Sequence, residues 1–137
     1  PPIEHGFYYD FHMDPIGDDG LREIEKRMKD LVKQNITIDR EDLDNESLRD
    51  MFSSNPFKLE IMDDKIGHDV GSSAYRQGEF VDLCRGPHIP HTGRVKAFVV
   101  TKNSASLWLG KQGNDQLQRV YGISLSELGR FICCCGG

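Results

Sequence analysis

The first third of the chain combines a short aromatic run with a long charged stretch of regular apolar spacing. Residues 6–11 are aromatic-rich, and Pro15 and Gly17 follow them, which predicts a strand and then a turn. Asp18 or Asp19 is expected to cap a helix that follows the turn. Its apolar positions recur every three or four residues, and they are Leu21, Ile24, Met28, Leu31 and Val32. We expect one apolar face of this helix to pack on a sheet.

The pattern becomes mostly strand-like after Pro56. Before it, residues 36–38 predict a weak strand, and residues 44–52 a short helix that the following Ser, Asn and Pro terminate. The later predicted strands are residues 57–62, 74–77, 79–83, 95–101, 105–109 and 117–121. Helices that do not alternate regularly with the strands favour an α+β fold, with a largely antiparallel sheet packed against two or more helices.

The chain has 137 residues, 37% of them hydrophobic and 28% charged, which fits one globular domain. It contains neither the roughly 18 apolar residues of a membrane helix nor a signal peptide, so we expect no membrane association. A cytoplasmic location is expected, with an organellar one left open. Because the chain begins on two prolines, we expect a piece of a longer polypeptide. Adjacent Cys133, Cys134 and Cys135 fit neither a disulfide framework nor a zinc-site spacing.

Charge is distributed unevenly along the sequence. Residues 1–84 hold 20 acidic and 10 basic side chains, whereas residues 85–137 hold 2 acidic and 7 basic ones. The net charge of -5 argues against a general nucleic-acid binder, whose phosphate contacts require a basic excess. The basic part suits an edge that faces phosphates, and chance clustering of solvated charge is an equal alternative.

The sharpest motif is Asp82-Leu83-Cys84-Arg85-Gly86-Pro87-His88, a strand end that runs into a turn. Cys84 and His88 can point to one spot across that turn, because Gly accepts unusual backbone angles and Pro fixes its own. The pair could ligate a metal or hold a water. Two ligands do not make a zinc site, and on spacing alone a structural pair is the more frequent case.

The longer strings around this motif carry a family resemblance. GEFVDLCRGPHIPHTG, AFVVTKNSASLWLGK and LQRVYGIS closely resemble the editing domain of threonyl-tRNA synthetases, and PPIEHGFYYDF, IEKRMKDLV and FKLEIMDDKIGHD agree in the same order. The resemblance covers residues 1–123 and leaves 124–137 as a divergent tail that is helix-like at 125–128. The related alanyl-tRNA synthetase modules usually read CGGTH at the turn, so the threonyl family fits better.

The resemblance implies hydrolysis of the ester that joins serine to the tRNA for threonine. Serine lacks one methyl group of threonine, and a missing methyl is worth only about 1–3 kcal/mol of discrimination, so a second, hydrolytic step is needed. The implied partners are the acceptor end of that tRNA and the remainder of the parent synthetase, whose ATP-dependent aminoacylation core lies outside this chain. No cofactor is required, and zinc on Cys84 and His88 is a possibility that nothing else in the sequence supports.

The resemblance also implies roles for individual residues. Cys84 and His88 line the pocket around the ester, and Lys58 positions water or stabilises negative charge. Asp82 holds the α-amino group of the substrate. Arg85 approaches a phosphate or braces the turn. Residues near the amino acid and the terminal adenosine are Gly6, Phe7, Tyr8 and Tyr9. The other histidines are expected at the surface, and they are His5, His12, His68 and His91.

The family pattern is incomplete in this sequence. The family places a His-x-x-x-His pair upstream of the GFYYD segment, and no two histidines here stand four apart. We therefore expect a fragment truncated at both ends. Two other functions stay open: a catalytically incomplete remnant that only binds the tRNA acceptor end or the parent synthetase, and a small structural zinc domain.

Overall fold

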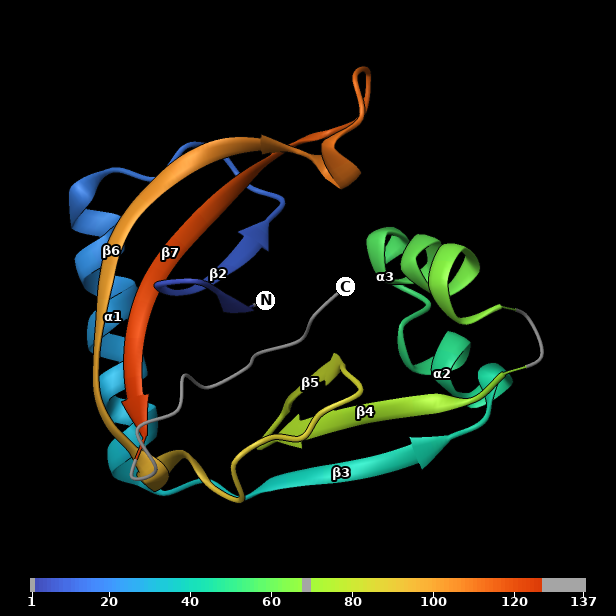
Figure 1. Ribbon diagram of the computed structural model, residues 1–137, viewed down its shortest axis with the longest axis horizontal. Coiled ribbons are helices and arrows are strands. Elements are labelled where there is room, and N and C mark those ends of the chain that lie inside the picture. Colours follow the sequence, from blue (N-terminus) through green and yellow to red (C-terminus); the bar gives the residue numbers. More distant parts are fainter. Residues whose placement is uncertain (1, 68–69, 127–137) are drawn as a thin grey trace.

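Two antiparallel sheets form the frame of the molecule, which a computed structural model describes for residues 2–67 and 70–126 (Figure 1). The first sheet has the order β1-β2-β7-β6, and its strands are β1 (Pro2–Ile3), β2 (Gly6–Phe11), β7 (Gln116–Ser126) and β6 (Val95–Leu107). The second sheet has the order β3-β4-β5, and its strands are β3 (Ile38–Leu43), β4 (Ser72–Gln77) and β5 (Phe80–Leu83). This arrangement confirms the α+β class, although the expected single sheet is two sheets.

Helix α1 (Asp18–Gln34) packs on the first sheet, as its apolar spacing predicts. Leu21 is buried against Val100 and Val120, so the apolar stripe of the helix forms the first core. Glu25 is buried in the same layer, where it pairs with Arg22 at 2.7 Å and accepts a hydrogen bond from the Val100 amide. These two contacts satisfy the Glu25 carboxylate where it faces the sheet. They lie beside a bulge that interrupts the pairing of β6 with β7.

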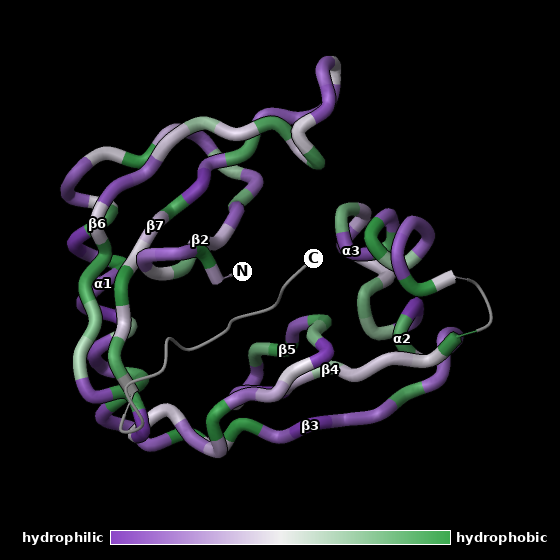
Figure 2. Tube along the Cα trace, in the orientation of Figure 1, coloured by the Kyte–Doolittle hydropathy of each residue, from purple (hydrophilic) through white to green (hydrophobic). Residues whose placement is uncertain are grey.

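The second sheet packs against α2 (Asn45–Met51), α3 (Pro56–Ile61) and a π-helical turn (Met62–Ile66). This second core consists of the buried side chains Leu48, Phe52, Met62, Ala74 and Leu83. Strand β3 forms one edge of the second sheet and is mostly hydrophilic (Figure 2). An edge strand with charged side chains resists pairing with another chain.

The strand predicted at residues 57–62 is wrong, because residues 56–61 form α3 and Lys58 therefore lies on a helix. Asn55 caps this helix, and its side chain accepts a hydrogen bond from the Lys58 amide at 3.2 Å. Pro56 occupies the first turn, where a helix needs no amide donor. The Ser-Ser-Asn-Pro stretch thus ends one helix and begins the next.

Other element boundaries also differ from the predictions. The strand expected at residues 36–38 runs over Ile38–Leu43, and the two expected at 95–101 and 105–109 are the single strand β6. Leu125 and Ser126 continue β7, so the helix predicted there is wrong, and the rest of the 124–137 tail lies outside the described residues. No helix in the described part of the chain is long and apolar enough to cross a membrane.

Candidate functional site

A cavity of about 920 Å³ lies where residues of both sheets meet α3 and the β6–β7 hairpin. Its walls come from β2, α3, the end of β5 and the hairpin tip Trp108–Gly110, a short 3₁₀ turn. The polar and aromatic side chains that line it include Tyr8, Tyr9, Lys58, Cys84, Arg85 and Trp108. Chain segments far apart in sequence thus supply one concave surface.

Lys58, Asp82 and Tyr9 form a polar network at the wall of this cavity. The Lys58 ammonium group pairs with Asp82 Oδ1, and the Tyr9 hydroxyl donates to Asp82 Oδ2 at 2.8 Å. The Leu83 amide donates to Asp82 Oδ1 at 2.8 Å, and Asp82 is only 4% exposed. This buried carboxylate therefore fixes the Lys58 side chain and the Tyr9 ring from behind.

Cys84 and His88 form the second polar pair. His88 Nε2 lies 3.1 Å from Cys84 Sγ, and the Gly86 amide donates to the same sulfur at 3.2 Å. Gly86 has a φ of 73°, which glycine adopts without strain, and a Cβ there would overlap the Tyr75 hydroxyl. The Gly-Pro turn therefore brings the thiol and the imidazole together, as the sequence predicts.

Tyr75 supports this pair, although no sequence signal pointed to it. Its ring stacks on the His88 imidazole with centroids 3.9 Å apart and an interplanar angle of 13°. Arg40 lies 3.5 Å from the Tyr75 hydroxyl, and it donates to the Arg85 carbonyl at 3.3 Å. Burial lowers the pKa of His88, against a smaller opposing effect of the Asp82 charge, so the neutral imidazole is favoured.

Most of the predicted site residues either line the cavity or contact a residue that does. Lys58, Cys84, Arg85, Tyr8 and Tyr9 line it. Asp82 contacts Lys58, and His88 contacts Cys84.

Gly6 and Phe7 precede the two lining tyrosines on β2. Gly6 closely approaches the Gly122 backbone, and Phe7 pairs with Gly122 across the sheet. Neither residue is part of the described cavity lining, and their role toward substrate stays a prediction.

An aromatic wall at the hairpin tip is a second feature that the sequence did not indicate. Phe57 lies between His12 and Trp108, with ring centroids 5.2 and 5.0 Å away. The Trp108 indole donates to Glu60 Oε2 at 2.6 Å. These contacts join α3 to the hairpin, which brings Lys58 over the cavity.

One of the other histidines departs from the expected surface position, because His91 Nδ1 is buried with no hydrogen-bond partner among the described residues. His91 as a whole is half-buried, and its backbone pairs with Thr37 across an isolated bridge. His12 is exposed, as expected, and it lines the cavity. His5 is exposed, as expected, and His68 lies outside the described residues.

The arrangement offers two donors to a metal, Cys84 and His88. Within residues 2–67 and 70–126, no group of three or more His, Cys, Asp or Glu side chains is arranged to hold a metal ion. A structural zinc site normally needs four such ligands, so the pair as it stands does not fit one.

Comparison with known proteins identifies the family. Residues 73–121 match the family described as the threonyl and alanyl tRNA synthetase second additional domain. The chain is 43% identical over 129 residues to the threonine–tRNA ligase of Thermotoga maritima, covering 93% of this chain and 20% of that protein. The enzyme of Syntrophotalea carbinolica is 43% identical with the same coverage, and that of Streptococcus thermophilus is 42% identical over 90% of this chain and 19% of its own length.

The chain spans about a fifth of the length of these relatives. The matched residues 73–121 contain β4, β5 and the Cys84 turn, and the wider similarity extends over most of the remaining chain. Residues 73–121 therefore belong to the family of the threonyl and alanyl tRNA synthetase second additional domain, within a chain that is similar over most of its length to part of threonine–tRNA ligases.

Proposed function

We propose that the chain hydrolyses the ester of seryl-tRNA for threonine, as the editing segment of a threonyl-tRNA synthetase. The observation that carries this proposal is the cavity that Lys58 and Cys84 both line, with Asp82 and His88 bonded behind them. A cation and a thiol–imidazole pair on one concave surface are suited to acyl-ester cleavage. The tRNA acceptor end and the rest of a parent synthetase are the proposed partners.

In the proposed reaction, water attacks the ester carbonyl, the bond to the ribose oxygen breaks, and that oxygen leaves with a proton. The Lys58 ammonium stabilises the negative charge that develops on the carbonyl oxygen. His88, kept neutral by burial, accepts the proton of the attacking water through the Cys84 thiol and returns it to the leaving ribose oxygen. Each contribution is worth about 10²- to 10³-fold in rate. The step as written needs no cofactor.

Binding of the acyl-adenosine end rests on the aromatic wall of β2. Tyr8 and Tyr9 offer ring faces of the kind on which bases stack. Asp82 already accepts three hydrogen bonds or ion-pair contacts, which leaves one lone-pair direction on Oδ2 for the substrate ammonium group. In the proposed site, the main role of Asp82 is to orient Lys58 and Tyr9.

The alternative is a segment that binds the tRNA end without cleaving it. This alternative is favoured by one observation: His88 contacts Cys84 but is not part of the described cavity lining. The two functions differ in a single measurable quantity, the rate of ester loss.

The deciding experiment follows deacylation of seryl-tRNA for threonine by the chain. We expect hydrolysis above the buffer rate, lowered about 10²-fold or more by Lys58→Met and by His88→Ala, while His5→Ala, at an exposed histidine, matches the wild type. A wild-type rate equal to buffer would exclude hydrolysis and favour the binding alternative. Threonyl-tRNA, measured in parallel, tests selectivity for the seryl ester, and elemental analysis for stoichiometric zinc tests the structural-zinc alternative.

A further inference from the structure

A second cavity, of about 790 Å³, adjoins the first between the ends of β3 and β4 and the π-helical turn. The two cavities share four lining residues, which are Lys65, Ile66, Ser72 and Arg85. A ligand that fills the first cavity and continues along the surface can therefore enter the second without leaving the protein.

The second cavity carries an excess of positive charge. Its charged lining residues are Arg40, Asp42, Lys65 and Arg85. Asp42 is neutralised by Arg40, whose Nε lies 2.9 Å from Asp42 Oδ1. Lys65 and Arg85 form no ion pair with any described residue, and both are exposed. Two cations thus remain available to an anion at the junction of the cavities.

The chain around this junction holds Arg85 in place while leaving its guanidinium group accessible. The Arg85 carbonyl accepts a hydrogen bond from Arg40, and the neighbouring Gly86 amide binds Cys84. Ser72, a residue with a hydroxyl group, lines both cavities. Basic side chains and a hydroxyl group are the usual partners of nucleic-acid phosphates.

We propose that this second cavity binds a backbone phosphodiester of the strand whose acylated 3′ end occupies the first cavity. Lys65 and Arg85 supply the positive charge. Arg40 orients Arg85 through its hydrogen bond to the Arg85 carbonyl. The path of the strand from the first cavity to the second rests on the proposed function. The Arg85 side chain contacts the phosphate, while the Arg85 carbonyl accepts the hydrogen bond from Arg40 within the turn.

The test measures binding rather than cleavage. A fluorescently labelled single-stranded oligonucleotide that ends in CCA, without an amino acid, is titrated with the chain between about 50 and 200 mM salt, and anisotropy gives the affinity. We expect log K to fall linearly with log salt. In Lys65→Gln and in Arg85→Gln the slope becomes shallower by about 0.7 for each phosphate contact that is lost. Far-UV circular dichroism checks that these surface changes leave the fold intact.

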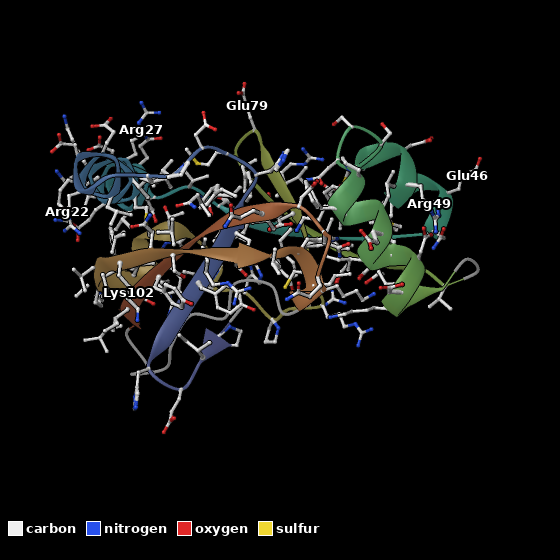
Figure 3. All side chains as sticks on the ribbon, turned by 90° about the horizontal axis from the view of Figure 1, so that it is seen from above. Arg22, Arg27, Glu46, Arg49, Glu79 and Lys102 are labelled. Carbon is white, nitrogen blue, oxygen red and sulfur yellow. The ribbon has the colours of Figure 1, made fainter. Side chains whose placement is uncertain are left out.

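The matched control is Arg27→Gln, which also removes one exposed positive charge. Arg27 lies on α1, and Figure 3 shows it at the opposite end of the molecule from Arg49 on α2, the helix that packs against the second sheet. Its slope should equal that of the wild type. Slopes unchanged in both Lys65→Gln and Arg85→Gln, or no binding by the wild type, would overturn the phosphate site. Failure of hydrolysis alone would appear in the seryl-ester assay and leave the salt-dependent binding in place, so the two failures are distinguishable.

Discussion

Asp82 shows at the level of single residues how the site is built, because one buried carboxylate orients two side chains of the cavity wall. Asp82→Asn removes the charge that balances Lys58, whose side chain is 18% exposed. We expect the free energy of unfolding to fall by about 3 kcal/mol, since breaking a buried ion pair leaves an uncompensated charge. Urea denaturation measures this.

Glu23→Gln is the matched control, because it breaks an ion pair with Arg27 in which both side chains are more than half exposed. It should destabilise the fold much less than Asp82→Asn does, because water screens an exposed ion pair. Equal losses in the two variants would contradict a stabilising role for the buried network.

His88 should make stability and hydrolysis depend on pH. Burial lowers its pKa below the ordinary value of 6.5, so the unfolded chain binds a proton before the folded chain does. The folded state therefore loses stability as the pH falls below 6.5 toward the pKa of the folded state, and His88→Gln should weaken this dependence. Denaturation at a series of pH values measures the effect.

The stacked ring of Tyr75 covers one face of that imidazole. Tyr75→Leu should raise the pKa of His88 by exposing the imidazole, whereas Tyr75→Phe should preserve the lowered pKa. A titration of the His88 ring protons by NMR distinguishes the two. Identical titration curves in both variants would show that the stack does not control the proton affinity.

Helix α3 illustrates what a single sequence can and cannot predict about an element. The helices α1 and α2 were predictable from their apolar spacing. The expected cap of α1 is wrong, because its N-cap is Gly17, which has no side chain to accept a hydrogen bond, rather than Asp18 or Asp19. Phe57, Leu59 and Ile61 alternate as in a strand, and only the Asn55 cap and Pro56 favour a helix. The site residues came from the family resemblance, whereas Tyr75 and Trp108 enter through contacts between strands and loops distant in sequence.

The cap of α3 should also matter for function. Asn55→Ala and Asp44→Ala each remove a side-chain acceptor from a helix N-terminus, so each should lower the stability of the fold by a similar amount. Only Asn55 holds the helix that carries Lys58. At equal loss of stability, we therefore expect Asn55→Ala to slow seryl-ester hydrolysis more than Asp44→Ala does. Equal rates in the two variants would show that the cap of α3 does not affect hydrolysis.

On the scale of the whole molecule, the site depends on two cores that lie apart. One core lies between α1 and the first sheet, and the other between the second sheet and its helices. Contacts across the cavity join them, chiefly Tyr9 to Asp82 and Trp108 to Glu60. The cavity therefore keeps its geometry only while the contacts between the two cores persist. The stability of these contacts can be measured directly.

Trp108 is the single tryptophan of the chain, so its fluorescence reports the contact between the hairpin and α3. In the wild type we expect urea midpoints from fluorescence and far-UV circular dichroism to coincide, as in one cooperative transition. Glu60→Leu deletes the indole acceptor and keeps the fluorophore, so its fluorescence midpoint should fall below the dichroism midpoint. Glu79→Leu, at an exposed turn position between β4 and β5 where the side chain points outward, should leave the two midpoints equal (Figure 3). Coincident midpoints in Glu60→Leu would mean that the remaining contacts, including Tyr9 to Asp82, suffice to couple the two cores.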